Sequence, residues 1–215
     1  MIKYILFDLD GTLTDSKEGL FKSIQYALSH YGINEENTDN LKCFIGPPIH
    51  YAFCEFYGFP SDKADEATKL FRERFSVKGI YENKLYSGVF DMLKELKENG
   101  KVLALATAKP EQFAKTVIDY FDISQFFDCV VGTTMENKDH NKASIINKVL
   151  EELNADKNES IMVGDRKFDI LAAKECDVKS VGVNYGYAPE NELKEFGADF
   201  IVDTTTDLKE LLLKL

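Results

Sequence analysis

This sequence of 215 residues lacks the patterns that mark membrane-spanning, zinc-binding and disulfide-bonded proteins. Its four cysteines form no CxxC pair, and its three histidines form no cluster beside them. We therefore expect no zinc site and no disulfide, but reduced thiols in a cytoplasmic protein. No apolar run approaches the length of a membrane span, so no membrane partner is expected. The largely apolar stretch 1–7 stops at Asp8, too early for a signal peptide, and predicts a buried strand.

Positive charge is also in short supply, because 37 acidic residues face 26 basic ones and give a formal net charge of -11. A surface of this sign repels polyanions, so we expect no nucleic acid polymer as a partner. A small anionic substrate is compatible with it where a metal ion and a few cationic side chains neutralise the substrate locally.

Short apolar runs alternate with amphipathic segments along most of the chain. The runs predict buried strands at 4–7, 102–106, 129–131, 161–163 and 180–183. The amphipathic segments predict helices at 89–98, 111–120, 142–153, 168–175 and 208–213. This alternation is typical of the α/β class and predicts a doubly wound parallel sheet.

Residues 15–85 break that alternation. Three apolar stripes with helical spacing occur there, and they begin at Leu20, Ile49 and Ala64 and end at Tyr31, Phe56 and Phe75. No second strand follows the first for roughly 90 residues, a distance that the usual short connections of an α/β core do not reach. We therefore expect residues 1–14 and 86–215 to form the core, with residues 15–85 inserted as an all-helical cap domain.

Two carboxylates, Asp8 and Asp10, directly follow the first expected strand in the motif Asp8-Leu9-Asp10-Gly11-Thr12. Ligands of open parallel sheets bind beyond the carboxyl ends of the strands. Carboxylates this close together are costly unless positive charge lies between them, and Gly11 lets the backbone turn tightly. The motif predicts a site for a metal ion or a phosphate-bearing substrate; a polar turn is the alternative.

Thr107 ends the expected strand 102–106, and the sequence Ala108-Lys109-Pro110 is expected to open a helix. A hydroxyl and the first N–H groups of a helix together suit an anion. A threonine that simply caps the helix is the alternative that the sequence leaves open.

Lys142 opens the expected helix 142–153 and lies on its buried face, four residues before Ile146. A lysine there needs an anionic partner, unless it only reaches out from the edge of the core. The competing Lys138 precedes the helix. Asp165 follows the strand 161–163, and Asp169 faces the same way if a helix begins promptly; an acidic helix start is the alternative.

In order and spacing, these motifs resemble the haloacid dehalogenase superfamily of phosphatases, over essentially the whole chain. The matching positions are Asp8 to Thr12, Thr107, Lys142 and Gly164 to Asp169, with the helical insertion between the first two. Within the superfamily the chain most resembles the phosphoglycolate phosphatase-like group. The segments 44–48 and 162–169 resemble those of members described as 5′-nucleotidases.

The resemblance implies an Mg²⁺-dependent phosphomonoester hydrolase that acts on a small phosphorylated metabolite, either phosphoglycolate or a nucleoside 5′-monophosphate. Asp8 would be the nucleophile and form an aspartyl-phosphate, and Asp10 the general acid and base. Mg²⁺ would be held by Asp8, Asp165 and the backbone carbonyl of Asp10, since hard oxygen ligands suit that ion.

The resemblance also implies that Thr107 and Lys142 hold the oxygens of the transferred phosphoryl group, with Asp169 orienting Lys142 or a metal-bound water. Phe44 and Gly46, between two cap helices, are candidates for substrate specificity. The alternative is a helix-entry turn with Phe44 in the core of the cap.

Two other functions remain open. A phosphosugar mutase of the same superfamily shares every core residue, and only the cap could separate the two. A non-catalytic binding or regulatory protein on this fold would be expected to have lost at least one core group, and none is lost. A dehalogenase would not need the second acid, so Asp10 argues against it.

Overall fold

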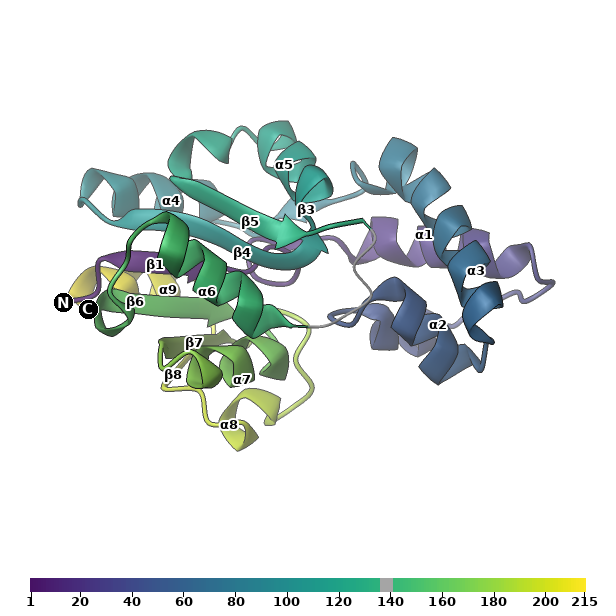
Figure 1. Ribbon diagram of the computed structural model, residues 1–215. Coiled ribbons are helices and arrows are strands. Elements are labelled where there is room, and N and C mark those ends of the chain that lie inside the picture. Colours follow the sequence, from purple (N-terminus) through teal and green to yellow (C-terminus); the bar gives the residue numbers. More distant parts are fainter. Residues whose placement is uncertain (136–140) are drawn as a thin grey trace. The chain divides into compact units, whose positions relative to one another are not determined.

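The computed structural model describes residues 1–135 and 141–215, and Figure 1 shows its elements. The chain divides into two compact units. The larger unit contains residues 1–15, 85–135 and 141–215, and the smaller contains residues 16–84. Within the part of the chain described, no helix combines the length and hydropathy that a membrane span requires.

The larger unit is built on a six-stranded sheet in the order β5-β4-β1-β6-β7-β8. In that order the strands are Cys129–Thr133, Val102–Pro110, Tyr4–Phe7, Ser160–Gly164, Lys179–Val183 and Phe200–Val202. Every neighbouring pair is parallel. The strand order reverses at β1, and the predicted doubly wound parallel sheet is confirmed.

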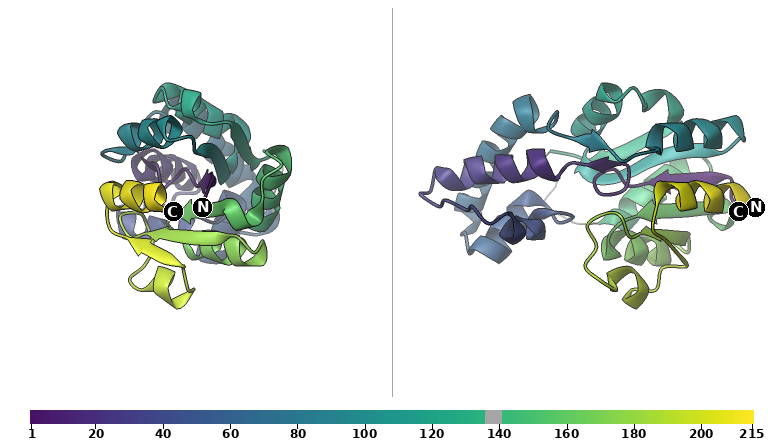
Figure 2. Two further views of the ribbon diagram at one scale, coloured as in Figure 1. Left: turned by 90° about the vertical axis from the view of Figure 1, so that its left-hand side faces the viewer. Right: turned by 180° about the vertical axis from the view of Figure 1, so that it is seen from behind.

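Helices cover both faces of this sheet (Figures 1 and 2). The helices α6 (Lys142–Glu152) and α7 (Lys167–Glu175) pack side by side on one face. On the other face α4 (Val89–Glu98) packs beside α9 (Thr205–Lys214). The helix α5 (Glu111–Tyr120) packs on β4 and β5, and the short α8 (Glu192–Glu195) contacts α7. The two chain ends meet, since Ile2 N donates to Leu215 O at 2.7 Å.

The central strand β1 is dry on both faces, because Ile5, Leu6 and Phe7 are fully buried. Burying such side chains contributes about 1.5–3 kcal/mol each to folding, which explains why the run is apolar without alternation. Phe7 pairs with Leu105 of β4 and with Val163 of β6. This register brings the carboxyl ends of these three strands to one edge of the sheet, where Asp8 and Asp165 lie.

The smaller unit is helical. Its α-helices are α1 (Lys17–Ser29), α2 (Ile49–Tyr57) and α3 (Ser61–Arg74). A 3₁₀-helix, Thr38–Phe44, and a π-helical turn, Phe75–Gly79, were not expected from the sequence. The segments β2 (Thr14–Asp15) and β3 (Lys84–Leu85), where the chain leaves and rejoins the sheet-containing unit, form a two-stranded sheet.

Most residues of the expected apolar stripes fall on these helices, but Tyr31 lies beyond the end of α1, Phe75 lies in the π-helical turn, and Phe56 was wrongly expected on a buried face. Phe56 is 50% exposed and lies in edge contact with Tyr51, whereas Phe53 of the same helix is fully buried. The helix α2 is short, and its buried side is made by Ala52 and Phe53 alone. That residues 15–85 work as a cap over the site remains a prediction.

Candidate active site

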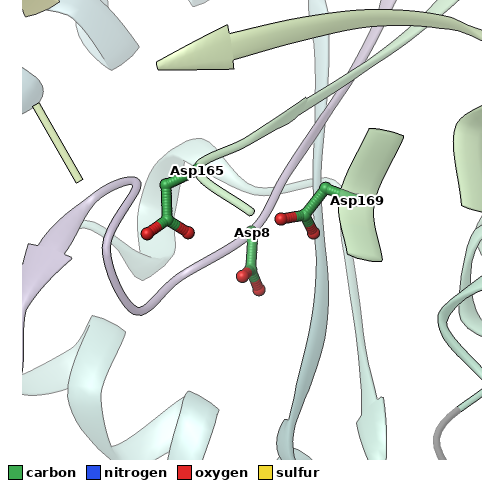
Figure 3. Close-up of side chains that lie close together, drawn as sticks. All are labelled: Asp8, Asp165 and Asp169. Carbon is green, nitrogen blue, oxygen red and sulfur yellow. The ribbon is translucent and has the colours of Figure 1, made fainter. Parts of the chain in front are cut away.

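Three aspartates, two from strand ends and one from a helix start, form a compact acidic cluster (Figure 3). Asp8 follows β1, Asp165 follows β6, and Asp169 lies in the first turn of α7. One carboxylate oxygen of each lies within 4.8 Å of the others. Asp165 and Asp169 are 1% and 2% exposed and lie away from bulk water, whereas the side chain of Asp8 is 15% exposed. A group of buried hard oxygen donors suits a divalent cation such as Mg²⁺.

Lys142 supplies positive charge to this cluster. Its ammonium nitrogen lies 2.8 Å from Oδ1 of Asp8 and 2.9 Å from Oδ1 of Asp169. Burial lowers the pKa of Lys142, but the carboxylates of Asp169 and Asp8 outweigh it and raise the pKa above its ordinary value. The lysine therefore stays protonated at neutral pH. Its competitor in the sequence, Lys138, lies outside the described residues.

Asp165 has one oxygen committed and one available. Its Oδ2 accepts a hydrogen bond from the backbone N–H of Tyr187 at 2.7 Å. Its Oδ1 is buried and has no hydrogen-bond partner among the described residues. Burial, and then the charges of Asp169 and Asp8, raise the pKa of Asp165 well above its ordinary value. A buried carboxylate oxygen without a partner fits a metal ligand, because a bound cation would supply the missing interaction.

Two glycines let the backbone close around Asp165. Gly11 has φ of 85°, and a Cβ there would lie 2.1 Å from Oδ2 of Asp165. A Cβ at Gly186 would lie 2.3 Å from Cβ of Asp165 and 2.4 Å from the carbonyl oxygen of Gly11. Side chains cannot approach this closely, so both positions require glycine for the carboxylate to keep its place.

Asp10 is paired with Lys109, a residue that the sequence did not mark as part of the site. Its Oδ2 lies 2.5 Å from the ammonium nitrogen of Lys109, whose side chain is 8% exposed. Oδ1 of Asp10 is buried without a hydrogen-bond partner among the residues described. The available clue was a lysine two residues beyond Thr107, at the end of the strand that neighbours β1.

Thr107 is buried, at 2% exposed, and its setting differs from the expected one. The strand β4 does not end at Ala106 but continues to Pro110, after a register shift against β5. Helix α5 begins only at Glu111. Thr107 is therefore not a helix cap, and its Oγ1 instead accepts a hydrogen bond from the backbone N–H of Lys109 at 3.2 Å.

Asp169 serves two partners. Besides the contact of Oδ1 with Lys142, its Oδ2 accepts a hydrogen bond from the backbone N–H of Arg166 at 3.2 Å. This second bond closes the first turn of α7 and fixes the carboxylate that faces the lysine. Its predicted role, to orient Lys142 or a metal-bound water, stays a proposal.

Sequence reasoning also missed the loop after β7. The hydroxyl of Tyr187 donates to Oδ1 of Asp15 at 2.8 Å, and the hydroxyl of Tyr185 donates to the carbonyl of Thr12 at 3.0 Å. This loop is thus joined to the segment after β1 by two hydrogen bonds. Its position after the strand next to β6 was the clue, since all parallel strands end at the same edge.

The two specificity candidates lie in the smaller unit. Phe44 is 1% exposed and packs against Phe53 and Tyr57, with ring centroids 5.0 and 5.6 Å apart. This packing favours the alternative interpretation, in which Phe44 belongs to the core of that unit. Gly46 has φ of 103°, a conformation that side chains rarely adopt, so glycine is needed there by the backbone itself.

Comparison with known proteins agrees with the geometry. Residues 5–183 match the family of haloacid dehalogenase-like hydrolases. A curated relative from Pseudomonas aeruginosa, named 5′-nucleotidase, is 39% identical over 190 residues, which cover 88% of this chain and 86% of that protein. A crystal structure of a predicted phosphatase from Clostridium acetobutylicum matches with a TM-score of 0.95 at 39% identity, over 100% of both chains.

One similar protein carries a different name. The tyrosine-protein kinase PtkA of Mycobacterium tuberculosis is 33% identical over 202 residues, which cover 94% of this chain and 66% of that protein. Similarity of sequence across this fold therefore spans more than one phosphoryl-transfer activity, and the assignment of function depends on the groups in the site.

Proposed function

The chain belongs to the family of haloacid dehalogenase-like hydrolases and is an enzyme of the phosphatase class, and we propose that it is an Mg²⁺-dependent phosphomonoester hydrolase with Asp8 as nucleophile. The observation that carries the proposal is the pairing of Asp8 with Lys142 at 2.8 Å, beside a buried oxygen of Asp165 that has no partner among the described residues. The carboxyl end of the sheet then carries a nucleophile, a fixed cation and a metal ligand.

In the first step, a carboxylate oxygen of Asp8 attacks phosphorus, and the bond from phosphorus to the leaving-group oxygen breaks. Asp10 gives that oxygen a proton, which matters most when the leaving group is a poor one. In the second step, Asp10 takes a proton from water, and the water oxygen attacks the phosphorus of the aspartyl-phosphate. Inorganic phosphate leaves and the carboxylate of Asp8 is restored.

The remaining groups stabilise the negative charge of the phosphoryl group. Lys142, held between Asp8 and Asp169, would contact an equatorial oxygen of the phosphoryl group, and the hydroxyl of Thr107 would contact another. The residues present fit Mg²⁺, which would be held by Asp8, Asp165 and the backbone carbonyl of Asp10, with Asp169 nearby. When bound, the ion neutralises charge between the nucleophile and the phosphate.

For the substrate we propose a small phosphorylated metabolite, and a nucleoside 5′-monophosphate ahead of phosphoglycolate. The name of the Pseudomonas aeruginosa relative supports the nucleotide. We also propose a cytoplasmic location, in keeping with four cysteines that are all free thiols in the structure.

A substrate panel tests this function. Release of phosphate with Mg²⁺ should be measured for several nucleoside 5′-monophosphates, phosphoglycolate, a hexose phosphate and a phosphotyrosine peptide. We expect kcat/KM for one nucleotide to exceed that for phosphoglycolate by at least about tenfold, or 1.4 kcal/mol in transition-state binding. Hexose phosphate isomerised without phosphate release would reveal a mutase. No turnover of any ester would favour a binding protein.

A further inference from the structure

Lys109 lies beside the site and is largely buried, and the proposed reaction assigns it no role. Its ammonium lies 2.5 Å from Oδ2 of Asp10, and its side chain is 8% exposed against 26% for Asp10. A pair this sheltered loses little of its attraction to solvent screening. The lysine can therefore restrict which way the Asp10 carboxylate turns.

The pairing leaves the two oxygens of Asp10 unequal. Oδ2 is taken by Lys109, whereas Oδ1 is buried and without a hydrogen-bond partner within residues 1–135 and 141–215. A general acid must present one oxygen, in a defined direction, to the atom that it protonates. With Oδ2 fixed, Oδ1 is the oxygen left for that proton.

The backbone around Lys109 is itself held in place. Its N–H donates to Oγ1 of Thr107 at 3.2 Å, and the carbonyl of Ala108 accepts from the hydroxyl of Thr133 at 3.0 Å. On the other side, a Cβ at Gly132 would lie 2.6 Å from the carbonyl oxygen of Lys109, so glycine permits this close approach of β5. The lysine therefore lies on a hydrogen-bonded segment of strand β4 rather than on a loop.

We propose that Lys109 is a positioning residue that orients Asp10 for proton transfer, and that through its backbone N–H it aligns the same turn with the Thr107 hydroxyl. The inference rests on the proposed phosphatase function. One residue thus couples the acid–base group to the group that binds the phosphoryl oxygens.

The test is a leaving-group comparison. Lys109→Met removes the charge and keeps most of the volume. General acid help is worth about 10²–10⁴-fold for a poor leaving group and least for a good one. We expect kcat/KM for an alkyl phosphate to fall at least about tenfold more than kcat/KM for p-nitrophenyl phosphate. Lys115→Met is the matched control, because that lysine is 54% exposed and forms an ion pair with Glu111 on the surface of α5. It should leave both esters unchanged.

A double-mutant cycle separates positioning from direct substrate contact. If Lys109 acts through Asp10, then Lys109→Met in the background of Asp10→Asn should cost less than about threefold on the alkyl ester, because the effects of groups that act as a unit do not add. Additive losses, or equal losses on both esters, would overturn the proposal and make Lys109 a substrate-binding or purely structural residue.

Folding is checked in parallel by thermal unfolding. Should Lys109→Met be unfolded, Lys109→Arg keeps the charge but not the geometry, and the same ratio of losses between the two esters decides the question. A wild-type enzyme that hydrolyses neither ester would instead refute the proposed function, which is a different outcome from equal losses in the variants.

Discussion

The ammonium of Lys142 lies 2.8 Å from Oδ1 of Asp8, although one residue opens helix α6 and the other follows the first strand. The contact places a fixed positive charge beside the proposed nucleophile. It also compensates a second carboxylate, that of Asp169, at 2.9 Å. Stability and chemistry at this edge of the sheet therefore depend on the same lysine.

Replacing Lys142 by methionine should destabilise the metal-free protein by about 3–5 kcal/mol, because it leaves the buried carboxylate of Asp169 and the partly buried carboxylate of Asp8 without their cationic partner. Urea unfolding in the presence of a chelator measures this. Lys148→Met, on the same helix with a side chain 55% exposed, is the control and should change stability by less than about 0.5 kcal/mol. A loss for Lys142→Met no larger than the control would show that the buried carboxylates do not depend on this cation.

Mg²⁺ should raise the melting temperature of the wild type, because it binds the folded acidic cluster and not the unfolded chain. In Asp165→Asn the rise should shrink markedly, since the buried Oδ1 without a hydrogen-bond partner would be replaced by a weaker ligand or a donor. Thermal unfolding at increasing Mg²⁺ measures both. Activity should return with Mg²⁺ after chelation but not with Ca²⁺, whose larger size and looser coordination misplace the nucleophile and the phosphate. An equal thermal shift in the two proteins would remove Asp165 from the metal site.

In the smaller unit, Arg74 holds Glu82 with two hydrogen bonds of 2.8 and 3.0 Å. These bonds and the charge of the guanidinium lower the pKa of Glu82 below its ordinary value. A lowered folded-state pKa means that the stabilisation is fully present above the unfolded pKa and is lost as pH falls through the folded one.

Glu82→Gln should accordingly cost about 1 kcal/mol at pH 7, and its difference from wild type should fade as pH drops below about 4. Urea unfolding at pH 7, 5, 4 and 3 follows this difference. The exposed Glu55→Gln, on α2, is the control and should show no such trend. A difference between wild type and Glu82→Gln that is constant from pH 7 to pH 3 would mean that the carboxylate charge contributes nothing.

Phe44→Ala distinguishes packing from substrate recognition. Because Phe44 is 1% exposed against two other rings, its loss should cost about 3–5 kcal/mol in unfolding free energy. If Phe44 serves packing, activity on a nucleotide and on phosphoglycolate should fall in parallel. A tenfold or larger shift in the ratio of the two kcat/KM values, with stability unchanged, would instead make Phe44 a specificity residue. Gly46→Val is a poorer probe, since φ of 103° makes any side chain strained there.

The sequence predicted those parts of the structure that local pattern determines. Helix α5 was expected at 111–120 and is Glu111–Tyr120, because its apolar stripe and the preceding proline both mark it. The strand β8, Phe200–Val202, was missed because three residues carry too little periodicity to recognise. The extension of β4 past Ala106 was missed because its last residues are not apolar and pair only after a register shift.

The residues of the site also separate into those that local sequence pattern predicts and those that it does not. Six site residues stood out because each lies at, or just past, an expected strand end or an expected helix start. They are Asp8, Asp10, Thr107, Lys142, Asp165 and Asp169. Lys109 and Tyr187 did not stand out, since their importance lies in partners that only the folded sheet brings near. Which oxygen of a carboxylate is bound and which is left is likewise a property of the three-dimensional structure alone.

The measurement that tests the central claim most directly is the Mg²⁺-dependent kcat of Asp8→Asn on the best ester of the panel. An amide is a poor nucleophile and a weaker metal ligand, so the nucleophile's loss should reduce kcat by more than about 10³-fold, or roughly 4 kcal/mol in the barrier. The fold should survive, because the residue follows the strand rather than forming its core. A kcat within tenfold of wild type, from protein shown to be folded and free of wild-type enzyme, would contradict the assignment of Asp8 as the nucleophile.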